Sequence, residues 1–221
     1  MKIIELFEEI DTARAKAVSA NLERYKNQPV TLRINSPGGS VTAGMLMADA
    51  IQRHGKVTAE IVGLAASMAS VVAVAAKDAR MSSTALIMIH NPWMAAQGDS
   101  RTLRKEADAL DKFSGSLVTY YSNKTGKSRE QIQSLMDAET WLDAYQAKDG
   151  RFIDAIFKGS DARAAIRWQT KFPGIIARLA VAPKKTPLQL AAEYMAMPAG
   201  PRRQAFFEIH KNQLFLARTL L

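Results

Sequence analysis

The amino-acid sequence predicts a layered α/β fold with parallel strands, followed by a basic helical extension. Short apolar runs with the period-two pattern of strands are separated along the chain by segments with helical periodicity. Sharp Gly- and Pro-containing turns separate these segments. Because parallel strands need crossover connections, usually helices, this order favours a parallel sheet covered by helices.

The first ninety residues contain most of the predicted strands. A short strand and turn occupy residues 1–10, and Asp11 caps a helix that runs to about Lys26. We then expect a strand at 30–34, a turn at 35–40, a helix from 41 to about 54 and a strand at 57–62. A buried helix should begin near Ser67, and an apolar strand at 85–89 leads into His90.

Helices dominate the next part of the chain. An amphipathic stripe predicts a long helix from Asp99 to about Lys124. The pairs Ser128/Gln131 and Asp143/Gln146 are capping boxes, which predict two shorter helices separated by a connector at 137–142. A last short strand is expected at 151–154.

Composition restricts the classes of protein. A chain of 221 residues, 48% of them hydrophobic, can bury one core and carry an appendage. We expect no signal peptide and no membrane partner, because the N-terminus mixes acids with apolar residues and no long uncharged apolar run exists. The absence of cysteine excludes disulfides and fits a cytoplasmic location. With three histidines and no cysteine, no metal site and no cofactor are expected.

The positive charge is concentrated at the C-terminal end. The net charge is +9, and eleven basic against three acidic side chains follow Asp154. We therefore divide the chain into a domain at 1–157 and a basic helical extension at 158–221. Nucleic acid is not the expected partner, because the extension lacks regularly interleaved aromatic residues. A packing extension and a partner-binding helix both remain open.

Three segments are candidates for chemistry, and each also has a plain structural explanation. The turn Asn35-Ser36-Pro37-Gly38-Gly39 can simply join strand to helix, or its glycines can expose backbone N–H groups to a ligand. Ser67 can be a helix N-cap, or a nucleophile at a helix N-terminus where unpaired N–H groups stabilise an oxyanion. His90 can be a histidine at the core edge or a general base.

Together these segments resemble the fingerprints of the ClpP family of serine peptidases. The matching residues are Ile34–Gly44, Ala65–Ala69 and Met88–Pro92, and the resemblance covers about residues 1–157. It implies the ClpP/crotonase-like spiral of β-β-α units with a protruding handle helix. The helix at 99–124 would be this handle, through which a homo-oligomer stacks.

The resemblance also implies roles for individual residues. Ser67 would be the nucleophile, His90 the general base, and the N–H groups of Gly38 and Met68 the oxyanion hole. Asn35, Ser36, Pro37 and Gly39 would lie along a protein or peptide substrate. The family has an aspartate where this chain has Glu139, so Glu139 is the expected third catalytic residue, with Asp137 as the alternative; either carboxylate could instead be merely solvated.

Several functional hypotheses remain open at this level. The Glu139–Leu142 segment and the basic extension look most like phage head-maturation (prohead) proteases, which implies a capsid or scaffold protein as substrate and the assembling prohead as a location. A general proteolytic subunit would need a separate ATPase unfoldase, because the chain has no phosphate-binding loop motif. An inactive structural or assembly subunit is a third hypothesis. Crotonase-like acyl-CoA chemistry is a fourth, although it does not require the Ser67/His90 pair.

Overall fold

A computed structural model describes residues 2–158 together with residues 194, 195, 200 and 204. The chain divides into two units, Met1–Ala165 and Ile166–Leu221, and the elements below all belong to the first. Except for Lys158 and four isolated positions, the predicted extension 158–221 lies outside the described residues. The domain boundary after residue 157 therefore stays a prediction.

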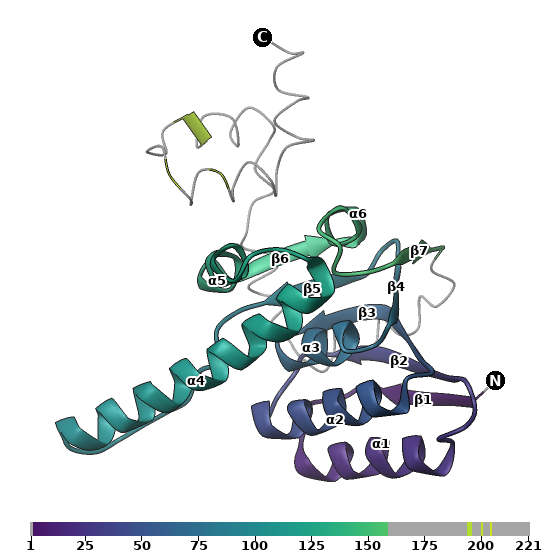
Figure 1. Cartoon of the computed structure of the whole chain (residues 1–221), viewed down its shortest axis with the longest axis horizontal. Coiled ribbons are helices and arrows are strands. Elements are labelled where there is room, and N and C mark those ends of the chain that lie inside the picture. The colour runs from purple at the N-terminus through teal and green to yellow at the C-terminus, as the bar shows by residue number, and fades with distance from the viewer. Residues whose placement is uncertain (1, 159–193, 196–199, 201–203, 205–221) are drawn as a thin grey trace. The chain divides into compact units, whose positions relative to one another are not determined.

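Strands and helices largely alternate along the described chain (Figure 1). In order they are β1 Lys2–Leu6, α1 Thr12–Arg24, β2 Val30–Ser36, α2 Val41–His54, β3 Val57–Ala66, α3 Met68–Val74, β4 Asp78–Ser82, β5 Leu86–Ile89, α4 Ser100–Thr125, α5 Arg129–Asp137, β6 Thr140–Asp143, α6 Ala144–Asp149 and β7 Ala155–Phe157. The expected caps are present: Asp11 accepts the Arg14 N–H, and both capping boxes form.

The strands form one mixed sheet in which most neighbours are parallel. Its main path is β1-β2-β3-β4-β7, and every pair along this path is parallel. β5 is parallel to β3, and β6 runs antiparallel to β5 at its edge. The predicted α/β class with a parallel sheet is confirmed.

Strand β3 changes its partner halfway along its length, and this places the site. Its first half, Thr58–Ile61, pairs with β4, whereas its last residues, Leu64–Ala66, pair with β5. The Asn35 side chain is buried beside this change and accepts the Leu64 N–H at 3.1 Å. The C-terminal ends of β3 and β5 therefore lie side by side. Residues that directly follow these two parallel strands are thus brought close together.

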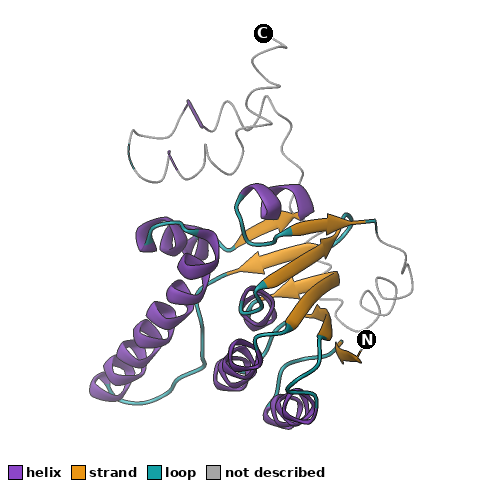
Figure 2. Ribbon diagram, turned by 45° about the vertical axis from the view of Figure 1, so that its right-hand side comes forward, coloured by secondary structure: helices purple, strands orange, loops and turns teal. Residues whose placement is uncertain are grey.

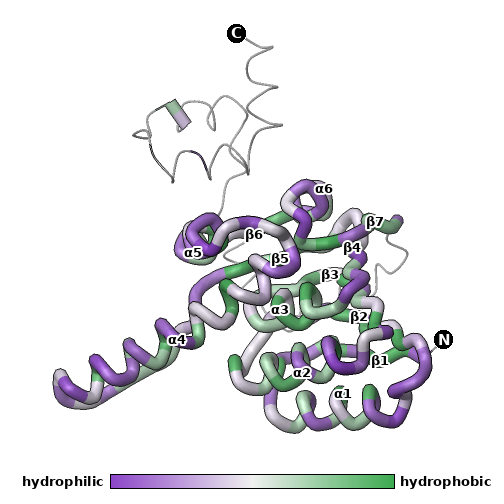
Figure 3. Tube along the Cα trace, in the orientation of Figure 1, coloured by the Kyte–Doolittle hydropathy of each residue, from purple (hydrophilic) through white to green (hydrophobic). Residues whose placement is uncertain are grey.

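Helices α1, α2 and α3 lie beside one another on one face of the sheet (Figure 2). α3 is buried along its whole length, and its sequence, MASVVAV, has a single polar residue. A helix that is apolar on all sides belongs in a core. Figure 3 shows this contrast, with hydrophobic colour on α3 and mostly hydrophilic colour at the free end of α4.

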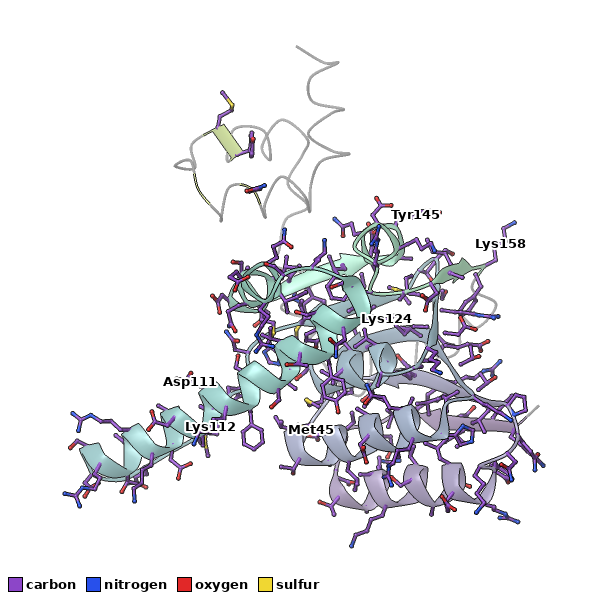
Figure 4. All side chains as sticks on the ribbon, in the orientation of Figure 1. Met45, Asp111, Lys112, Lys124, Tyr145 and Lys158 are labelled. Carbon is purple, nitrogen blue, oxygen red and sulfur yellow. The ribbon has the colours of Figure 1, made fainter. Side chains whose placement is uncertain are left out.

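Helix α4 is attached to the rest of its unit by its C-terminal half. Its buried residues are Leu117, Val118, Tyr121 and Thr125, and its N-terminal half extends away from the sheet (Figure 1). Lys124, labelled in Figure 4, fixes this end: its Nζ donates to the carbonyls of Ala76 and Lys77 and to Asp154. A role of α4 in stacking subunits stays a prediction.

The strands differ from the sequence prediction in several places. β4 was not predicted, and β6 forms at 140–143, where residues 140–142 were predicted as part of the connector. Both are short, and charged or half-exposed side chains hide their alternation. The last strand forms at 155–157 instead of 151–154, since Phe152 and Ile153 are buried without pairing in the sheet. β2 and β3 run past the predicted ends, through Ser36 and Ala66.

Candidate active site

Ser67 lies where β3 ends and α3 begins, as predicted. It occupies the N-cap position of α3, but its side chain makes no capping hydrogen bond. Its backbone has φ 53° and ψ −128°, a conformation that costs a non-glycine residue about 1–3 kcal/mol. Such strain is typical of functional sites, and here it is held by the Ser67 N–H donating to the Met88 carbonyl at 2.9 Å.

The Ser67 hydroxyl is instead bonded to His90. The distance from Ser67 Oγ to His90 Nε2 is 2.7 Å, and both residues are half-buried. His90 follows the last residue of β5, so the pairing of β5 with β3 brings the imidazole to the serine. This is the geometry that a serine nucleophile and its base require.

Gly38 is packed directly against Ser67 and Met68. A Cβ on Gly38 would lie 2.7 Å from Ser67 Cβ and 2.9 Å from the Met68 nitrogen, and φ is +94°. Only glycine fits this approach. Met68 is the first residue of α3, where a backbone N–H has no partner inside its own helix. The two predicted oxyanion donors thus border the same hydroxyl.

The turn after β2 is fastened to the segment after β1. The Ile10 N–H donates to the Gly38 carbonyl at 2.7 Å, and the Ser40 N–H donates to the Ile10 carbonyl at 2.8 Å. The buried Ser36 hydroxyl donates to the Glu8 carbonyl and accepts the Gly38 N–H at 3.2 Å. Ser36 therefore helps to hold the turn that carries Gly38.

The two candidate carboxylates have different surroundings. Asp137 Oδ1 accepts hydrogen bonds of 2.8 Å from Asn91 Nδ2 and from Gln133 Nε2. Glu139 has φ 45° and lies at the junction of α5 and β6, and its side chain makes no hydrogen bond within residues 2–158. Because Ile89 pairs with Thr140 in antiparallel register, Glu139 comes next opposite His90.

Asn91 joins three elements beside the histidine. Besides donating to Asp137, its Oδ1 accepts from Ser114 Oγ of α4 at 3.0 Å and from Gln133 Nε2 of α5 at 2.9 Å. No site role was predicted from the sequence for Asn91, Ser114 or Gln133. The one hint in the sequence is that Ser114, a polar residue, lies next to the apolar stripe of α4. Only the fold brings the three residues together.

The described part of the chain has neither a cluster of metal-ligand side chains nor a membrane-spanning helix. No group of three or more histidine, aspartate or glutamate side chains there is placed to hold a metal ion. In the same residues, no helix has both the length and the apolar character needed to span a membrane.

The parallel-stranded fold, with a Ser67–His90 hydrogen bond at its strand ends, has the arrangement typical of serine hydrolases. The family model described as Clp protease matches residues 1–160. The chain belongs to the Clp protease family, and it is a serine-type peptidase.

Three similar proteins share the name ATP-dependent Clp protease proteolytic subunit 1. The protein from Chlamydia abortus is 40% identical over 134 residues, which cover 58% of this chain and 70% of the relative. The protein from Chlamydia caviae is 37% identical over 142 residues, covering 62% and 74% of the two chains. That from Chlamydia muridarum is 37% identical over 134 residues.

Proposed function

We propose that this protein is an endopeptidase that cleaves polypeptides with Ser67 as nucleophile and His90 as general base. The observation that carries the proposal is the 2.7 Å contact between Ser67 Oγ and His90 Nε2 at the ends of adjacent strands. In the reaction, His90 takes the Ser67 proton as Oγ attacks the scissile carbonyl, and later gives it to the leaving amine.

The N–H groups of Gly38 and Met68 then stabilise the tetrahedral oxyanion. Removing one such donor from a serine protease costs about 3–4 kcal/mol of transition-state stabilisation. Support comes from the packing of Gly38 on Ser67 and from the place of Met68 at the start of α3. The Gly38 N–H, which donates to Ser36 at 3.2 Å, turns to the oxyanion or is shared with it when substrate binds.

The substrate lies as an extended strand along the turn after β2. The hydrogen bonds to Ile10 use the Gly38 carbonyl and the Ser40 N–H, so the N–H and C=O of Gly39 point away from Ile10. These groups are free to pair with a substrate backbone. Asn35 and Ser36 act indirectly, because their buried side chains hold the turn. Pro37 restricts the backbone conformation at the start of this turn.

Asp137 is the carboxylate that we assign to His90. An orienting carboxylate must itself be held in place, and Asp137 is held by Asn91 and Gln133. Glu139 is nearest to His90 along the strand register, but no hydrogen bond holds its side chain within residues 2–158, and its backbone conformation is strained. Glu139 remains the alternative.

The wider role that we propose is that of a proteolytic subunit in an oligomer, supplied with unfolded chains by a separate ATPase. The relatives are named as subunits of an ATP-dependent protease, and this chain has no phosphate-binding loop motif of its own. α4, with exposed residues over most of its length, is the element available for contact between subunits.

A second candidate role is the processing of capsid or scaffold protein during phage head assembly. The sequence features that favour it are the Glu139–Leu142 segment and the basic stretch after Asp154, with its eleven basic side chains. Such a stretch suits contact with acidic scaffold segments. A protease of this kind would act without an unfoldase.

One digestion experiment separates the roles. Wild type and Ser67→Ala are incubated with an unfolded, carboxymethylated protein and with its folded form, each with and without a Clp ATPase and ATP. If wild type without ATPase cleaves the unfolded form and Ser67→Ala does not, the result supports the proposed peptidase activity. Cleavage of the folded form only with ATPase and ATP favours the subunit role. A purified phage scaffold protein cut without ATPase favours head maturation.

A further inference from the structure

A pair of buried hydroxyl groups lies directly behind Ser67. Ser70 of α3 and Tyr121 of α4 are 0% and 1% exposed, and their oxygens are 2.7 Å apart. Ser70 is the one polar residue of α3, and Tyr121 belongs to the short part of α4 that packs on it. Neither residue was selected from the sequence.

Ser70 contacts the backbone of the nucleophile. Its Oγ lies 2.6 Å from the Ser67 carbonyl oxygen and 3.1 Å from the Met88 carbonyl oxygen. The Ser70 N–H also donates to the Ser67 carbonyl, at 3.0 Å. The Ser67 carbonyl thus receives two hydrogen bonds from one residue.

The direction of the hydrogen bonds follows from counting protons. A serine hydroxyl has one proton, and a carbonyl oxygen can only accept. Ser70 therefore gives its proton to the carbonyls, so Tyr121 must donate to Ser70. Burial raises the pKa of the Tyr121 hydroxyl, so this group keeps its proton at neutral pH. The result is a chain from Tyr121 through Ser70 to the Ser67 carbonyl.

The Ser67 carbonyl and the Met68 N–H belong to one peptide group. Because that group is planar, fixing the direction of the carbonyl fixes the direction of the N–H on the opposite side. The same contacts fix the ψ angle of Ser67 at −128°, because ψ sets the direction of its carbonyl. A polarised chain of donors holds this peptide more firmly than the Ser70 N–H could alone.

We infer that Ser70 and Tyr121 are positioning residues, which aim the Met68 N–H at the oxyanion. The inference rests on the proposed use of Ser67 as nucleophile, and it makes a residue of α4 part of the support of the catalytic serine. The residues touch neither substrate nor leaving group. Their loss should lower kcat and leave KM unchanged, since an oxyanion donor acts only in the transition state.

The test compares Tyr121→Phe and Ser70→Ala with wild type. Each variant removes a hydroxyl and adds no volume, and Thr125→Val is the matched control. Thr125 is also a buried hydroxyl of α4, and it donates to the Tyr121 carbonyl at 2.7 Å without reaching Ser67. For each protein we would measure kcat and KM on a peptide, the rate of fluorophosphonate labelling of Ser67, and the melting temperature.

We expect kcat and the labelling rate to fall about tenfold in Ser70→Ala and about threefold in Tyr121→Phe, the size of one or part of one hydrogen bond. KM and the pH midpoint of kcat should not change, and Thr125→Val should match wild type in rate. The inference is overturned if both variants react at the wild-type rate, or if Thr125→Val loses as much. Should Ser70→Ala not fold, Tyr121→Phe decides alone. A wild type that never labels at Ser67 contradicts the proposed function itself.

Discussion

Gly38 and Ser67 approach each other so closely that a methyl group on Gly38 would lie 2.7 Å from Ser67 Cβ. Real Cβ atoms do not come this near to a packed neighbour. The approach joins two elements that the sequence separates by 29 positions, and it places one backbone donor from each beside the same hydroxyl.

Substituting Gly38 should therefore abolish activity. In Gly38→Ala the new methyl group would meet Ser67 and the Ala66 carbonyl, at φ +94°. We expect a loss of kcat of about a hundredfold or more, which is the cost of a displaced oxyanion donor. The control is Gly55→Ala, where φ is also positive, at +70°, but the nearest atom is 4.0 Å away. It should lose stability and keep its specific activity; equal losses of activity would refute the role of Gly38.

The assignment of the third catalytic residue gives a second prediction. We expect Asp137→Asn to lower kcat by at least about a thousandfold, because loss of the orienting carboxylate leaves the imidazole in the wrong tautomer or orientation. Glu139→Gln should lower it less than tenfold. Steady-state kinetics at neutral pH with a peptide substrate measures both. The reverse order would assign the role to Glu139 instead.

Lys124 should matter for stability more than other lysines of α4. Its side chain is 10% exposed, and its ammonium group bonds two carbonyls near the end of α3 together with Asp154. Lys124→Met should reduce the free energy of unfolding by about 1.5–3 kcal/mol, since hydrogen bonds to charged groups are lost. Lys112→Met, on the exposed part of α4, should change it by less than about 0.5 kcal/mol. Urea denaturation at pH 7 measures both, and equal effects would contradict the account.

The ion pair between Asp78 and Arg80 should make the stability of the protein depend on pH. The Arg80 guanidinium, which bonds both oxygens of the carboxylate, holds the pKa of Asp78 below its usual 3.8. A lowered pKa means that the carboxylate adds stability above about pH 4, and that this stability is lost as the pH falls through the folded-state value.

Asp78→Asn should therefore be less stable than wild type at pH 7, by less than about 1 kcal/mol because the pair is partly exposed. The difference should shrink as the pH falls below about 4 and through the lowered folded-state pKa, because Asp78 of the wild type then takes up a proton. Denaturation at pH 7, 5 and 3 checks the trend, with Asp108→Asn on the exposed part of α4 as control. A difference that grows toward pH 3 would contradict the sign.

The sequence predicted those parts of the fold that local chemistry determines. Helix caps at Asp11, Ser128 and Asp143 and the left-handed Gly55 and Gly126 mark helix ends within a residue or two. β4 and β6 could not be predicted, because their pairing depends on where β3 changes partner. That change is a property of the whole sheet.

The same division holds for the site. The motifs around Gly38, Ser67 and His90 are local, and their spacing in the chain indicated a common site before any contact was known. Asn91 with Gln133, and Ser70 with Tyr121, are pairs from distant elements with no motif of their own. The third catalytic residue could not be chosen from the sequence for a similar reason. Asp137 and Glu139 are two residues apart, and only their surroundings distinguish them.

The most direct test of the central claim is mass spectrometry after treatment with a fluorophosphonate probe. Wild type, Ser67→Ala and His90→Ala are labelled under identical conditions, and the modified peptide is identified. We expect one probe adduct on Ser67 in wild type, none in Ser67→Ala, and labelling at least about a hundredfold slower in His90→Ala. Labelling of another serine, or a Ser67 that labels equally fast without His90, would contradict it.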